Sequence, residues 1–134
     1  SPTPQGAPAD RIRAVFPGWK NIHQFEGDAE VVPGIRAVNS NGHTPGHTSY
    51  HVVAGGQQLM VLGDVTNVRA LNMTNPGWHL VFDVDPNLAE ANRRKVFDRL
   101  VADKVAATGY HWGSPGAGTI EKDGKGYALV PVKA

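Results

Sequence analysis

The segment Asn41-Gly42-His43-Thr44-Pro45-Gly46-His47-Thr48 decides how this 134-residue chain is interpreted. Its two histidines are four residues apart, a spacing that would align them on one face of a helix. Pro45 and Gly46 disfavour a helix, because proline lacks a backbone N–H and glycine favours turns. We therefore predict a loop that leads into a strand beginning near Ser49, with His43 at the apex of the loop.

An apolar run from Leu59 to Leu62 ends in Gly63-Asp64. Because the run is continuous rather than alternating, it predicts a strand that is buried on both faces. A carboxylate at the tip of a buried strand is costly unless it is paired or binds a cation. Asp64 could instead cap a following turn, where aspartate is common. The apolar strand before it favours cation binding.

A third candidate, His111, follows a predicted strand from Val105 to Thr108 and a glycine. The loop after it, residues 113–118, contains only small residues and proline, so it could wrap closely around a site. Trp112 and Trp78 could line a pocket there. The alternative for both tryptophans is simple packing.

We expect His43, Asp64 and His111 to converge at one rim of a sheet, within reach of a metal ion or an ion pair. His47 is predicted to support the loop through a hydrogen bond rather than to bind metal. Thr44 is predicted to hydrogen-bond the loop backbone.

The remaining pattern predicts strands mixed with a few helices, in an α+β or layered α/β order. Predicted helices cover Asp10–Phe16 and, from the Asp85-Pro86 start signal, residues up to about Lys104. Predicted strands cover Asn21–Phe25, Glu30–Val32, Ile35–Val38, His51–Ala54, Leu59–Leu62, Val105–Thr108, Thr119–Lys122 and Tyr127–Val132. The arginines Arg93, Arg94 and Arg99 are assigned to a solvated helix face, in preference to a phosphate-binding role.

Composition narrows the partners and the chemistry. The chain has 13 basic and 12 acidic residues, which gives no support for a nucleic-acid or membrane partner. No apolar run approaches the roughly 20 residues of a membrane span. Cysteine is absent, so any metal ion must be held by histidine, aspartate or glutamate. We expect a soluble protein of bacterial type, in either the cytoplasm or the periplasm.

Four segments together resemble the second half of metallo-β-lactamase-fold hydrolases, in the branch with methyl parathion hydrolases and lactonases. They are GHTPGHT (Gly42–Thr48), LGD (Leu62–Asp64), FDVDP (Phe82–Pro86) and GYHWGSPGAG (Gly109–Gly118). The resemblance covers roughly Val31 to Val132. It implies half of a four-layered αβ/βα sandwich, an α+β unit with a mixed β-sheet and flanking helices. Residues 1–20 would then be a linker and a short helix, and residues 21–134 the half-domain.

The resemblance also implies roles for the candidate residues. In that family the equivalent of His43 ligates one metal ion, the equivalent of Asp64 bridges both ions, and the equivalent of His111 ligates the second. Zinc is the expected metal, with iron, manganese or cobalt as alternatives. A metal-bound hydroxide would attack an ester, lactone, lactam or phosphoester, and Asp64 would be central to catalysis.

One departure from the family is plain. Its HxHxDH motif, which supplies four further ligands from the first half, does not occur in this chain. We therefore expect the isolated chain to be inactive. Its expected partner is an N-terminal half or a second copy, either of which would cover an apolar sheet face that includes Ile35, Val52, Leu59 and Val61. The alternatives are a non-catalytic half-fold that self-associates or binds a partner, and a small binding module whose histidines are incidental.

Overall fold

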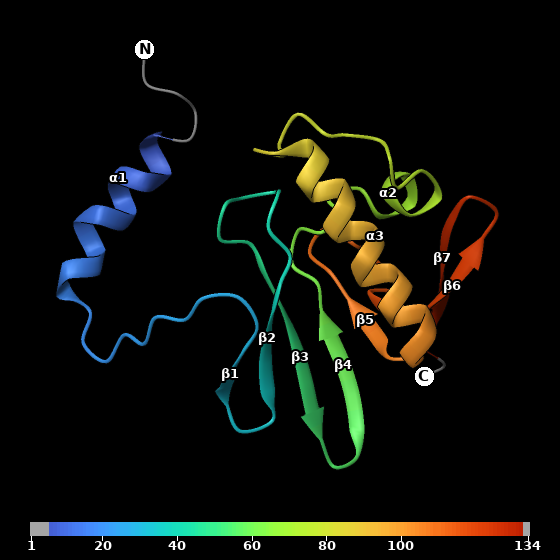
Figure 1. Ribbon diagram of the computed structural model, residues 1–134, viewed down its shortest axis with the longest axis horizontal. Helices are drawn as coiled ribbons and strands as arrows, with labels where there is room; N and C mark the ends of the chain where they lie inside the picture. The colour runs from blue at the N-terminus through green and yellow to red at the C-terminus, as the bar shows by residue number, and fades with distance from the viewer. Residues whose placement is uncertain (1–5, 133–134) are drawn as a thin grey trace.

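The computed structural model describes residues 6–132, which form one seven-stranded sheet with two helices packed beside it and an N-terminal helix that lies apart from it (Figure 1). The strands are β1 (Ala29–Val32), β2 (Ile35–Asn39), β3 (Thr48–Ala54), β4 (Gln57–Val61), β5 (Ala106–Thr108), β6 (Ala117–Asp123) and β7 (Gly126–Pro131). The helices are α1 (Gly6–Val15), the 3-10 turn η1 (Phe16–Gly18), α2 (Arg69–Thr74) and α3 (Pro86–Asp103). The strands lie in sequence order, and all neighbours are antiparallel except β4 and β5.

The parallel β4–β5 pair forces a long crossover, which contains α2 and α3. Helix α3 begins where the sequence predicts, because the Asp85 carboxylate accepts a hydrogen bond from the Leu88 N–H at 3.0 Å and Pro86 opens the first turn. It ends at Lys104, which adopts the left-handed conformation with φ 54°. In Figure 1 the helix crosses one face of the sheet.

The core lies between α3 and that face. Met60 lies in β4 and Leu62 directly follows it. Both belong to the same apolar cluster as Phe97 and Leu100 of α3, and all four side chains are almost fully buried. This packing holds the β4 exit, and therefore Asp64, against the helix.

The opposite face of the sheet carries a second apolar row. Strand register places Ile35, Val52, Leu59 and Ala106 side by side across β2, β3, β4 and β5. Each of these side chains is only partly buried in the chain by itself. Both faces of the central strands are thus apolar, as the continuous β4 run predicts.

Two expectations need correction, and one helix was missed. Asn21–Phe25 is not a strand: Asn21 has φ 65°, no neighbouring strand pairs with the segment, and β1 begins only at Ala29. The first helix runs from Gly6 to Val15 rather than from Asp10, so it includes part of the predicted linker, and residues 1–5 lie outside the described residues. Helix α2 was not predicted, since it is only six residues long and no side chain caps its start.

Within residues 6–132, no helix is both long enough and apolar enough to cross a membrane.

Candidate functional site

The three candidate residues stand on loops that leave the same rim of the sheet. His43 lies between β2 and β3, Asp64 follows β4, and His111 follows β5. The β4–β5 pairing continues past the strand ends, since the Leu62 N–H donates to the Thr108 carbonyl at 2.8 Å and the Tyr110 N–H to the Gly63 carbonyl at 3.0 Å. The loops after β4 and β5 are therefore tied together, which sets Asp64 beside His111.

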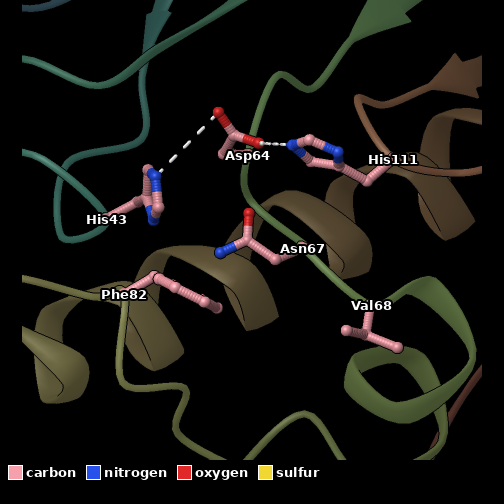
Figure 2. Close-up of a pocket in the computed structure, with 6 residues that line it drawn as sticks. All are labelled: His43, Asp64, Asn67, Val68, Phe82 and His111. Atoms are coloured by element: carbon pink, nitrogen blue, oxygen red, sulfur yellow. Dashed lines mark ion pairs between the residues drawn. The ribbon is translucent and has the colours of Figure 1, made fainter.

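The Asp64 carboxylate lies between the two imidazoles (Figure 2). Nε2 of His43 is 3.9 Å from Oδ2 of Asp64, and Nε2 of His111 is 3.2 Å from Oδ1. Each imidazole therefore faces a different oxygen of the same carboxylate. The predicted convergence of His43, Asp64 and His111 is confirmed.

Oδ1 of Asp64 is buried and has no hydrogen-bond partner among the described residues. His111 approaches it, but not in the direction of a hydrogen bond. A buried carboxylate oxygen without a partner costs free energy, and a cation is one of the groups that satisfies it. This oxygen is the strongest local sign that the rim is built for a positive ligand.

His43 is held in one tautomer by a residue with no role in the sequence-based interpretation. Its Nδ1 lies 3.0 Å from Oδ1 of Asp83, whose side chain is only 1% exposed. Because the carboxylate accepts, Nδ1 carries the proton, and in the neutral imidazole the lone pair on Nε2 is directed towards Asp64. A histidine oriented in this way by a carboxylate is a common arrangement around protein-bound metal ions. The FDVDP segment contains Asp83, but only the fold shows which side chain it meets.

His47 holds Asp64 in a comparable way. The Asp64 backbone N–H donates to Nε2 of His47 at 2.9 Å, so Nδ1 carries the proton and lies 3.1 Å from the Ser40 carbonyl. Burial lowers the pKa of His47, which favours this neutral form. The predicted supporting hydrogen bond is confirmed. Thr44 contributes differently, because its backbone carbonyl accepts from the N–H groups of Gly42 and His47.

Gly63 makes the approach of His47 possible. It has φ +60°, and a Cβ at this position would lie 2.8 Å from Nε2 of His47. The glycine before Asp64 is thus required by the contact between the two loops.

Arg93 is buried, so its assignment to a solvated helix face is wrong. The residue is 1% exposed and its side chain contacts Asp83 at 3.3 Å, whereas the side chains of Arg94 and Arg99 are 44% and 42% exposed. The sequence contains the signal for this. Arg93 lies four residues from both Ala89 and Phe97, which are apolar in the sequence and buried in the structure.

A cavity of about 540 Å³ opens at this rim. It is lined by His43, Asp64, Asn67, Val68, Phe82 and His111 (Figure 2). Phe82 and Val68 are 67% and 43% exposed and give the cavity an apolar wall beside its polar groups. Such a mixture is typical of small-molecule sites.

Neither predicted pocket tryptophan lines this cavity. Trp112 is buried in the core, where its indole N–H donates to the Thr66 hydroxyl at 2.7 Å. Trp78 is 54% exposed elsewhere. For Trp112 the packing alternative is the one that the structure supports.

The side chains at this rim are of the type that binds metal ions, but they are too few to complete a metal site. His43 offers a free imidazole nitrogen, and Asp64 offers an unsatisfied carboxylate oxygen. Within residues 6–132, however, no three histidine, aspartate or glutamate side chains surround one common metal position. Zinc sites take four ligands, and a catalytic site keeps three protein ligands for each ion. The arrangement matches a shared carboxylate with one histidine on either side, to which further ligands must be added.

Comparison with solved structures identifies the fold. AbOPH, a hydrolase in the beta lactamase superfamily, matches 78% of this chain with a TM-score of 0.72 and 28% identity, over 36% of its own length. AidC, a dizinc quorum-quenching lactonase, matches the whole chain with a TM-score of 0.77 and 22% identity, over 48% of its length. A probable metal-dependent hydrolase from Staphylococcus aureus matches 82% with a TM-score of 0.62 and 23% identity, over 40% of its length.

The chain thus has part of the metallo-β-lactamase fold, as predicted, and spans less than half of each of these three structures. Its mixed sheet with flanking helices agrees with the predicted C-terminal half. No protein-family model matches the chain, and neither does any curated protein sequence.

Proposed function

We propose that this chain supplies the C-terminal part of the active site of a metal-dependent hydrolase. The observation that carries the proposal is the buried, unsatisfied oxygen of Asp64, in a carboxylate flanked by the Nε2 atoms of His43 and His111. The likeness to metal-dependent hydrolases and a dizinc lactonase supports it. Asp64 would be the ligand shared by two metal ions, and each histidine would bind one of them.

Zinc suits a site made of imidazole and carboxylate, although iron, manganese and cobalt accept the same donors. Once bound, such ions make a nucleophile of water near neutral pH and polarise a carbonyl or phosphoryl oxygen. The chain's own residues orient the ligands. Asp83 keeps the lone pair of His43 directed into the cavity, and His47 fixes the backbone from which Asp64 projects.

The cavity also indicates where a substrate would lie. Phe82 and Val68 offer apolar area to the non-reacting part, and Asn67 offers an amide for hydrogen bonding. We infer a small ester, lactone, lactam or phosphoester with an apolar substituent. Binding the substituent on this wall would place the reactive group near Asp64, which is the contribution of remote contacts to catalysis.

Completion of the site requires a partner surface. Three side chains are too few ligands for two metal ions, and the apolar row of Ile35, Val52, Leu59 and Ala106 is only partly buried. We propose that an N-terminal half of the same fold, or a second copy of the chain, packs on this row and adds the remaining ligands. A non-catalytic half-fold that self-associates is the second candidate, and the same apolar row favours it.

The test is made on the complete gene product, with metal content measured by mass spectrometry and hydrolysis measured on lactone and phosphotriester substrates. We expect Asp64→Ala to abolish hydrolysis and lower the bound metal, because a shared carboxylate balances the charge of both ions. His79→Ala is the control, since His79 pairs with Glu90 away from the cavity. Unchanged metal content and hydrolysis in Asp64→Ala would rule out the proposed role.

A further inference from the structure

We propose that Arg93 is a positioning residue that holds the two ligand loops, those of His43 and Asp64, in fixed relation to each other. For its metal-binding consequence this inference rests on the proposed function. The geometry on which it stands belongs to the chain itself.

The guanidinium of Arg93 reaches both loops at once. Its Nε donates to the carbonyl of Val65, the residue after Asp64, at 2.8 Å. Its Nη2 donates to Oδ2 of Asp83 at 3.3 Å, and the other oxygen of Asp83 accepts from Nδ1 of His43. A single side chain on α3 therefore contacts the residue next to Asp64 and, through the Asp83 carboxylate, is linked to His43.

The remaining donors of Arg93 fix it in place. Its Nη1 donates to the Pro76 carbonyl at 2.7 Å and approaches the Trp78 carbonyl at 3.5 Å. Each of its three nitrogens thus has a protein acceptor, and the side chain is 2% exposed. The planar guanidinium can bind acceptors in several fixed directions, which the ammonium of a lysine cannot do.

Satisfying backbone carbonyls does not by itself explain why the two oxygens of Asp83 are divided between Arg93 and His43. A buried ion pair is weak evidence for stability, because well-packed apolar side chains of similar volume often serve as well or better. Here the pair splits Asp83 between two partners, one oxygen for Arg93 and one for His43. The arrangement gives the histidine an acceptor that cannot rotate away, which is what the directed lone pair of Nε2 requires.

The main test uses Arg93→Lys in the complete gene product, with Arg94→Met as the matched control. Arg94 is the neighbouring arginine, but it pairs with Glu90 on the surface of α3. Zinc affinity is measured by competition with a chelator at a temperature where each protein is folded. We expect Arg93→Lys to weaken zinc binding by about 10- to 100-fold, the usual effect of losing an outer partner of a metal ligand. Arg94→Met should stay within about two-fold, because its pair is exposed.

A second readout needs no metal. In the metal-free parent, 15N spectra should show the His43 imidazole as one tautomer, with the proton on Nδ1. In Arg93→Lys we expect averaged shifts from a mixture of tautomers, whereas Arg94→Met should keep the parent pattern. A residue that only stabilised the fold would shift the melting temperature and leave this pattern unchanged.

If Arg93→Lys does not fold, Asp83→Asn/Arg93→Met replaces it and is compared with Asp83→Asn alone, so that the difference between the two variants reports on Arg93. The double variant leaves no buried charge unpaired and keeps an acceptor opposite Nδ1 of His43, but the acceptor has lost its anchor. A folded variant with parental zinc affinity and the parental His43 spectrum would overturn the inference. If the parent itself binds no zinc, the proposed function fails, and the metal-free spectra still decide the role of Arg93.

Discussion

Replacement of His47 by alanine should weaken metal binding at the proposed site without abolishing it. His47 is not a predicted ligand, yet its Nε2 accepts the backbone N–H of Asp64 at 2.9 Å and its ring meets Ser40 on the other side. The imidazole therefore links the start of the His43 loop to Asp64, the proposed shared ligand. Alanine removes this link and leaves the Asp64 N–H without its acceptor.

The magnitude follows from that orphaned donor. Leaving a fully buried backbone N–H unpaired costs about 1–3 kcal/mol, and the Asp64 N–H is part-buried, so we expect a loss of unfolding free energy towards the lower end of that range. The position of Asp64 would relax, and zinc affinity should fall by about 10- to 100-fold. His47→Gln places a carbonyl oxygen near the position of Nε2. This variant should therefore retain part of the unfolding free energy and part of the zinc affinity. His51→Ala removes an exposed hydrogen bond with Gln58. It should change neither the unfolding free energy nor the zinc affinity.

The assay combines denaturant unfolding of the metal-free complete gene product with chelator competition for zinc. The reasoning predicts a graded series in metal binding: the parent, His47→Gln, His47→Ala and, weakest, Asp64→Ala. Equal and complete loss of metal from His47→Ala and Asp64→Ala would refute it, because His47 would then be acting as a ligand. Parental stability in His47→Ala would show that the Asp64 N–H does not depend on this acceptor.

Further expectations concern the packing of the His43 loop, the far end of α3 and the isolated chain. Gly42→Ala should lower unfolding free energy by at least about 1 kcal/mol in denaturant titrations, because its Cβ would lie 2.2 Å from the Ala89 nitrogen and φ is +131°. Gly46→Ala, with nothing within 4 Å, is its control. Hydrogen bonds from Lys122 and Tyr127 lower the pKa of Asp98 below its ordinary 3.8. The parent should therefore exceed Asp98→Asn in unfolding free energy, by about 1 kcal/mol or less for this exposed group, above pH 3.8, and lose that advantage as pH falls through the lowered pKa. A parent that keeps its advantage in acid would contradict this. The isolated chain, loaded with zinc, should lack turnover and self-associate in analytical ultracentrifugation; an active species near 14.3 kDa would contradict both.

The sequence was sufficient where local chemistry and tertiary structure agree. Asp85-Pro86 sets the start of α3 regardless of its neighbours, and the strand-end positions of Asp64 and His111 follow from a sheet whose apolar strands are short and bounded by glycines. Convergence at one rim needed only the additional assumption that the three loops leave the sheet on the same side.

It failed where the outcome depends on a distant partner. Asn21–Phe25 has apolar residues that suit a strand, but a strand exists only if a neighbour supplies the other half of the hydrogen-bond ladder, and here none does. The role of Asp83 could not be inferred, since its partners His43 and Arg93 are 40 and 10 residues away. Arg93 was misassigned because charge was given more weight than its position in the helix repeat.

The three predicted ligands differ in how far this chain prepares them. His43 has Asp83 and Asp64 has His47, and both partners come from other loops that α3 or the sheet holds in place. His111 is different: its side chain is 65% exposed, its backbone has φ 61°, and among residues 6–132 its ring has no hydrogen-bond partner. An exposed imidazole whose only polar contact in the described part of the chain is with Asp64 can change rotamer easily, so in the proposed site a further contact would be needed to fix it. We expect that contact on the side where the remaining ligands of the proposed site would enter, so this half-site would be pre-organised for one ion and would depend on a partner for the other.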